Sequence, residues 1–266
     1  MSLIDLSEAG WRVKRSILRT SQATQTPHVS SALSCADILV ALFYRKKMSA
    51  LCEIYMSKGH AALALYSALE EFGFISQSDL RSYGKDGTVF EGHVNSRIPG
   101  VPLSTGSLGH ALAFAAGRAF ADNVQNPAVE HWVLLSDGEL DEGSNWEALL
   151  LATHLGLHNL NIVIDRNRLQ SLKGTESTLA LEPLSKKFSA FNWRVEEVNG
   201  HNLVEISAAL ERASGFASPT CIIANTLKGY PLTDMMDEGV LFHYKPSTDS
   251  HLSTFDNLRP YEAGLN

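Results

Sequence analysis

The feature that most restricts the fold is an alternation of short apolar strands with helical segments in the second half of the chain. Strands are predicted at 132–135, 160–164, 193–198 and 220–224, with helices at 146–155 and 203–213. Connections of this length and type join parallel strands through right-handed crossovers. We therefore predict an α/β fold: a doubly wound, mainly parallel sheet with helices on both faces.

The first half of the chain is predicted to be mostly helical, interrupted by one long loop. Apolar residues recur at helical spacing over 6–21, 35–44, 60–72 and 109–124. The stretch 82–108 is rich in glycine and lacks periodicity, and long loops inside compact domains usually serve a function. We expect one domain over 1–246, followed by a polar, irregular tail over 247–266 that is partly disordered or covers a partner subunit.

Charge and cysteine content exclude several classes of protein. The net charge of −7 leaves no basic stripe for nucleic acid. Cys35, Cys52 and Cys221 are far apart and lack the spacing of a zinc site or a disulfide framework. Since no signal-peptide core and no run of about 18 apolar residues is present, we expect a soluble cytoplasmic protein that does not bind membranes.

Two oxygen-bearing side chains follow consecutive predicted strands. Asp137 ends one strand, and Asn167 lies just past the next. Ligands of open parallel sheets bind at this edge, so the two side chains can converge there on a hard cation such as Mg²⁺, with a diphosphate completing its coordination. Gly138 would let the backbone approach that diphosphate. The spacing alone is equally compatible with an ordinary Asp-Gly turn and a loop asparagine.

The segment Ser136–Ala148, continuing to 165–170, resembles the thiamine diphosphate signature of transketolases. Five further segments resemble transketolase motifs in the family's order: 28–39, 57–60, 92–93, 104–110 and 242–246. The resemblance departs from the family pattern at Pro27 and Ser30, which stand where glycines are usual and put the nearby substrate contact in question. The segment after Lys228 also lacks a second glycine, which leaves the path to His243 undefined.

This resemblance implies a role for each matching residue. The implied metal ligands, for Mg²⁺ or for Ca²⁺ or Mn²⁺ in its place, are Asp137, Asn167 and the backbone of Leu169. The implied contacts to thiamine diphosphate are His60, Gly106, Ser107, Leu108, Gly138, Glu139, Asn167 and His243. The residues implied to act on substrate are His28, His93 and His243, and Glu142 matches a glutamate that belongs to a relay between paired active sites.

Five other histidines are predicted to be structural or to lie on the surface. They are His110, His131, His154, His158 and His201. Nothing in the sequence places His110 or His131 at the carboxyl end of a strand, and the other three have no motif around them.

The resemblance implies half of a split enzyme. In transketolases the glutamate that activates the cofactor's aminopyrimidine belongs to a second domain, for which this chain has no room after Pro246. We therefore expect a diphosphate-binding subunit that transfers a two-carbon ketol unit from a ketose or ketose phosphate to an aldehyde, active only with a pyrimidine-domain partner in an α₂β₂ assembly. Alternatives are another thiamine diphosphate carboligase, a 2-oxoacid dehydrogenase component, and a catalytically silent half that serves assembly or regulation.

Overall fold

The computed structural model describes residues 3–214 and 217–262, and its centre is a parallel sheet in the order β1-β2-β3-β5-β4. The strands are β1 (Cys52–Met56), β2 (Glu130–Ser136), β3 (Leu160–Arg166), β4 (Arg194–Asn199) and β5 (Thr220–Asn225). The four strands predicted from apolar runs are thus present. The α/β prediction is confirmed, and every strand pair is parallel.

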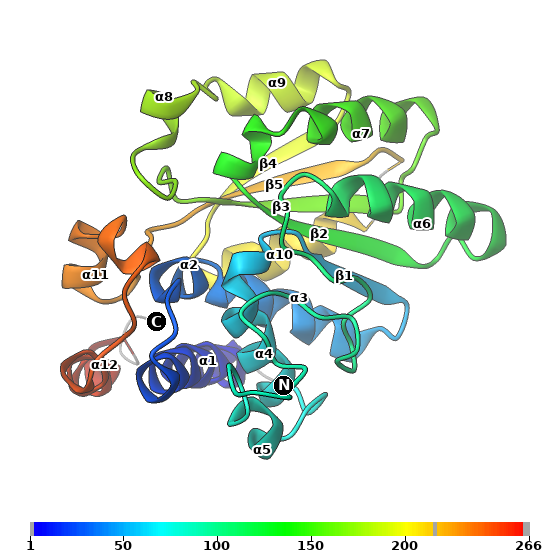
Figure 1. The fold of residues 1–266 in the computed structure, drawn as a ribbon. Helices are drawn as coiled ribbons and strands as arrows, with labels where there is room; N and C mark the ends of the chain where they lie inside the picture. The colour runs from blue at the N-terminus through cyan, green and yellow to red at the C-terminus, as the bar shows by residue number, and fades with distance from the viewer. Residues whose placement is uncertain (1–2, 215–216, 263–266) are drawn as a thin grey trace.

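Helices cover both faces of the sheet, as Figure 1 shows. One face carries α1 (Leu3–Thr24), α3 (Ala36–Met48), α4 (Ala62–Glu71) and α10 (Leu203–Ala213). The other carries α6 (Ala111–Gln125), α7 (Gly143–His154) and α9 (Leu184–Ala190). The shorter helices are α2 (Val29–Ser34), α5 (Gln77–Leu80), α8 (Thr175–Thr178) and α11 (Thr233–Asp237), with single 3₁₀ turns η1 (Gly59–Ala61), η2 (Gly138–Asp141) and η3 (Leu241–His243).

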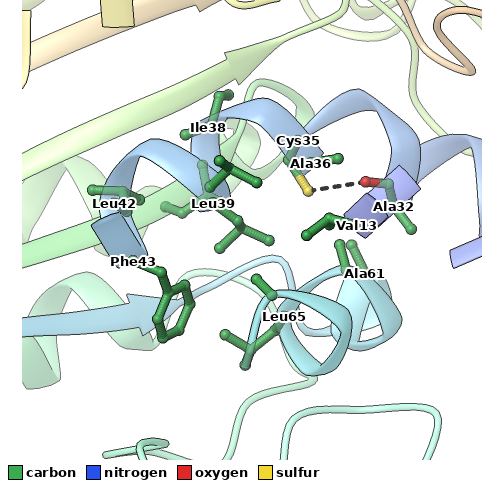
Figure 2. Close-up of a cluster of buried hydrophobic side chains, with 14 of the residues drawn as sticks. Val13, Ala32, Cys35, Ala36, Ile38, Leu39, Leu42, Phe43, Ala61 and Leu65 are labelled. Carbon is green, nitrogen blue, oxygen red and sulfur yellow. Dashed lines mark hydrogen bonds between the residues drawn. The ribbon is translucent and has the colours of Figure 1, made fainter. Parts of the chain in front are cut away.

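The larger hydrophobic core lies on the α3 face of the sheet. Figure 2 shows Leu39 and Phe43 of α3 on the side of α4, whereas Ile38 points away from α4, and all three are fully buried. Cys35 sits in this core with its thiol directed at the Ala32 carbonyl, 3.6 Å away. Burial raises the pKa of Cys35 to about 12, so the thiol is an unreactive packing group.

Several elements were not predicted from the sequence, among them the short helices α2, α8, α9 and α11, strand β1 and helix α12. Strand β1 was missed, because Glu53 interrupts its apolar run and a polar segment precedes it. The tail expected to be irregular instead forms α12 (Asp249–Glu262). Phe255 is fully buried and stacks on Trp11 of α1 with ring centroids 3.9 Å apart, so this part of the tail belongs to the domain.

The sheet has a topological switch between the neighbouring strands β3 and β5. The chain leaves β3 toward α8 and α9 on one side of the sheet, whereas it leaves β5 toward α11, which lies near α2 (Figure 1). Diverging connections of this kind open a ligand crevice at the carboxyl edge of the sheet. No helix within the described ranges is long and apolar enough to cross a membrane.

Candidate active site

Three histidines from distant segments meet in one cluster. His28 lies at the N-terminus of α2, His60 in η1 and His243 in η3. The ring centroid of His28 is 4.5 Å from that of His243 and 5.7 Å from that of His60, and the last two are 5.6 Å apart. The backbone N–H of His28 also donates to the His243 carbonyl at 3.1 Å, so the path to His243 that the sequence left undefined leads to this cluster.

Backbone geometry holds two of these histidines in place. His28 adopts the left-handed conformation with φ of +66°, which turns the chain into α2. Strand β1 ends just before Ser57 and delivers His60 to the edge of the sheet. A Cβ on Gly59 would lie 2.6 Å from the carbonyl oxygen of Thr105, so only glycine lets this turn pack against the loop that carries Gly106.

All three imidazoles are neutral at physiological pH. Burial is the largest cause that lowers the pKa of His28, His60 and His243, and the nearby lysines add to it. For His243 the pKa falls to about 3, with Lys228 the largest electrostatic contributor. Neutral imidazoles can each donate one hydrogen bond and accept another, which suits contacts to sugar hydroxyls.

Two buried lysines next to the histidines were not predicted as site residues. Lys58 pairs with the buried carboxylate of Asp165 and donates to the Ser31 carbonyl at 3.2 Å. Lys228 is 4% exposed and donates to the Gln170 carbonyl at 3.2 Å. In the described part of the chain, Lys228 has no carboxylate within ion-pair distance. Burial, reinforced by Lys58, lowers the pKa of Lys228 to about 8.

The position of Lys228 just after a predicted strand could have identified it as a site residue. It follows β5 as Asp137 follows β2, and polar residues just past parallel strands gather at one edge. What the sequence could not show is that β5 lies next to β3, which places Lys228 beside the loop after β3.

Asp137 and Asn167 converge on one turn, as the strand-end positions predicted. Asp137 accepts hydrogen bonds from the backbone N–H of Arg168 at 2.6 Å and from the Arg166 guanidinium at 3.1 Å. Asn167 accepts from the Leu169 N–H at 3.0 Å, while its amide group donates to Ser34 at 3.0 Å. Burial and the neighbouring Asp165 raise the pKa of Asp137.

The metal itself stays a prediction. Among the residues that the structure describes, no group of three or more His, Cys, Asp or Glu side chains could hold a metal ion. The predicted set has a different composition, with one carboxylate, one amide oxygen and one backbone carbonyl. Asp137 and Asn167 fit this predicted set of ligands, because the side-chain oxygens of both lie at the same turn.

The loop 104–109 packs on the turn that carries His60 and is held in place by Glu139. A Cβ on Gly106 would lie 3.2 Å from the ring of His93. Glu139 is fully buried, and its carboxylate accepts from the Gly109 N–H at 2.9 Å, the Ser136 N–H at 3.3 Å and the Ser57 hydroxyl. These hydrogen bonds tie the Glu139 side chain to the loop, and its predicted contact to the cofactor stays a prediction.

His93 and Glu142 lie outside the cluster. His93 is exposed, yet close enough to His28 to lower its pKa. Glu142 is exposed at the N-terminus of α7, next to Gly109. Neither the relay role of Glu142 nor the substrate contact of His93 is tested by this arrangement.

The five histidines predicted to be structural or on the surface lie where they were expected. His131 is buried and its Nδ1 lies 3.1 Å from the Tyr55 hydroxyl, in the core of the domain. His110, His154 and His158 are exposed. His201 is tied into a buried network away from the cluster.

The family "Transketolase, thiamine diphosphate binding domain" matches residues 18–243. The chain belongs to the transketolase family. The resemblance to transketolases is therefore confirmed, as is the assignment of the chain to the transketolase class of transferases and to the domain that binds thiamine diphosphate.

Similar proteins of comparable length are named as subunits. The transketolase domain is 33% identical to an apulose-4-phosphate transketolase subunit of Phocaeicola vulgatus, covering 84% of this chain and 83% of that one. It is 35% identical to the protein of the same name from Actinobacillus succinogenes, covering 87% of each. Identity to human transketolase is 32%, but this chain covers only 40% of it.

Solved transketolase structures also match this chain over its whole length but extend well beyond it. A transketolase mutant from Pichia stipitis superimposes with a TM-score of 0.83 at 24% identity, covering 100% of this chain and 41% of that one. The Campylobacter jejuni transketolase gives a TM-score of 0.81 at 25% identity, covering 99% and 43%. This chain thus spans about two fifths of the length of the solved transketolases that it matches.

Proposed function

We propose that this chain is the diphosphate-binding subunit of a two-chain transketolase that moves a two-carbon ketol unit from a ketose, free or phosphorylated, to an aldehyde. Relatives named as subunits match it over most of their own length, whereas human transketolase extends well beyond it. A second chain would supply the pyrimidine-binding half. We propose an α₂β₂ assembly, with the exposed Glu142 directed toward the junction between paired sites.

The observation that carries this proposal is the buried ammonium group of Lys228 beside three neutral imidazoles. A buried charge without a counter-ion is costly, and a diphosphate would supply the missing negative charge. Lys228, His60 and the backbone at Gly138 would hold that diphosphate. The loop 106–108 would line the thiazolium and aminopyrimidine rings.

A divalent cation fits next to this diphosphate. We propose that Asp137, Asn167 and the carbonyl of Leu169 bind Mg²⁺, with Ca²⁺ or Mn²⁺ as substitutes. Burial and Asp165 raise the pKa of Asp137, so negative charge is crowded here and a cation would offset it. Within the described part of the chain, Oδ1 of Asp137 accepts a hydrogen bond only from the Gly138 N–H, at 2.8 Å, which leaves it a lone pair for a metal.

The chain's own residues would orient the sugar and move protons. Bound thiamine diphosphate supplies the carbanion chemistry that cleaves and forms the carbon–carbon bond. His28 and His243 are neutral, so each can accept a proton from a substrate hydroxyl or donate a hydrogen bond to its oxygen. His93, exposed next to His28, would contact the sugar from the loop side.

Reconstitution tests the proposal. The chain is combined with a candidate pyrimidine-domain subunit, thiamine diphosphate and Mg²⁺, and ketol transfer from a ketose phosphate to an aldehyde is measured. We expect transfer by the pair and none by either chain alone. Robust transfer by this chain alone would refute the two-chain assignment, and a pair that binds no thiamine diphosphate would refute the cofactor assignment. Pyruvate as donor is the control for a different carboligase.

A further inference from the structure

We infer that His201 is a positioning residue for the diphosphate site, which it serves by fixing the backbone that carries Lys228. This inference rests on the proposed function, because that proposal places Lys228 against the diphosphate. His201 lies in the turn after β4, outside the histidine cluster. Its Nε2 accepts a hydrogen bond from the backbone N–H of Leu227 at 2.9 Å, one residue before Lys228.

The same bond fixes the tautomer of His201. A backbone N–H can only donate, so Nε2 carries no proton and the ring proton of the neutral imidazole is on Nδ1. Nδ1 lies 3.1 Å from Oδ2 of Asp37 and donates to it. His201 thus connects the loop after β5 to a carboxylate on α3.

That carboxylate is a rigid anchor. Asp37 and Lys14 are both almost completely buried, and their charged atoms are 2.7 Å apart. Although burial opposes ionisation, Lys14 and then His201 lower the pKa of Asp37, which keeps it charged. Gly10 of α1 packs directly on the carboxylate, since a Cβ there would lie 3.0 Å from Oδ1 of Asp37.

The loop is held a second time on the other side of Lys228. The ring of Tyr230 stacks on His201 with centroids 3.9 Å apart and an interplanar angle of 20°. Between these two contacts, the N–H of Gly229 donates to the Ser30 carbonyl at 3.1 Å. The backbone of Lys228 is therefore fixed at residues 227, 229 and 230, while its ammonium group reaches the Gln170 carbonyl.

These contacts on both sides of Lys228 keep its backbone in place before an anion binds. Fixing the backbone before the ligand arrives removes an ordering cost from binding. Leu227 is 54% exposed, so little packing of its own side chain holds this segment. The bond from His201 and the stacked Tyr230 take that role.

A double-mutant cycle on the complete two-chain enzyme tests the inference through thiamine diphosphate affinity, measured by titration calorimetry with Mg²⁺ present. His201→Phe keeps the stacked ring and removes both hydrogen bonds, and we expect it to weaken binding roughly tenfold. Lys228→Met is expected to weaken binding roughly 30-fold or more. The double variant should bind within about twofold of Lys228→Met alone, because His201 acts through Lys228.

Other results separate the possible failures. Fully multiplicative effects, or no effect of His201→Phe, would overturn the role of His201. An unchanged affinity in Lys228→Met would instead refute the diphosphate site itself. His158→Phe, at an exposed histidine, is the matched control and should bind normally. If His201→Phe does not fold, His201→Gln tests the inference instead. Its amide offers a donor and an acceptor, so we expect it to retain most of the affinity for thiamine diphosphate. A tenfold loss of affinity in His201→Gln without coupling to Lys228→Met would reject the inference.

Discussion

At the scale of single residues, the fold buries lysine ammonium groups, which costs free energy of folding. Lys58 is paired with Asp165, but among the described residues Lys228 has only a carbonyl partner. Burial and the nearby Lys58 lower the pKa of Lys228 to about 8. Sites that bind charged ligands often carry such a cost in stability.

Lys228→Met is therefore expected to stabilise the isolated chain at pH 7 by about 1–3 kcal/mol while it weakens cofactor binding. The unfolded lysine binds its proton up to about pH 10.5 and the folded one up to about pH 8, so the cost is fully present below pH 8 and disappears as the pH rises between these values. Urea unfolding at pH 7 and pH 10 checks this: the gain should shrink at the higher pH. A variant that is less stable at pH 7 would contradict the buried-charge argument.

At the scale of elements, the short strand β1 and the helix α12 are two elements that were not predicted from the sequence. Strand β1 matters because it delivers the Ser57–His60 turn to the edge of the sheet. Helix α12 is polar over most of its surface, and the few apolar residues that it buries do not produce a visible period. Its attachment to α1 decides whether the end of the chain is part of the domain.

Phe255→Ala should destabilise the isolated chain by about 3–4 kcal/mol, because a fully buried aromatic ring stacked on Trp11 would be lost. Chemical denaturation measures the change. Ser253→Ala, at an exposed position of the same helix, is the control and should change stability by less than about 0.5 kcal/mol. Equal effects of the two substitutions would mean that α12 does not pack as described.

At the scale of the whole molecule, we propose that a second chain completes the active site. The cofactor's diphosphate half would be held here, and the rest by the partner. The expectation of a cytoplasmic protein also concerns this scale, and it stays a prediction that localisation of the expressed protein would test.

Thiamine diphosphate with Mg²⁺ is expected to stabilise the two-chain complex against heating by about 2.7 kcal/mol at 100 times the dissociation constant, since only the folded complex binds it. Chelation by EDTA should abolish the shift, and added Mg²⁺ should restore it. Asp137→Asn should reduce it, because the proposed metal ligand loses its charge. A full shift in EDTA would remove the metal from the proposal.

The sequence by itself determined the α/β class, because apolar strands alternating with helices can only bury themselves in a parallel sheet. The histidine and aspartate motifs could also be found from the sequence, because each motif is a short contiguous segment of the chain. Only the tertiary structure decided that β5 lies beside β3, that Lys228 therefore faces the loop after β3, and that His28, His60 and His243 share one cluster. Strand order and contacts between distant loops depend on packing across the whole domain, which no local pattern of residues specifies.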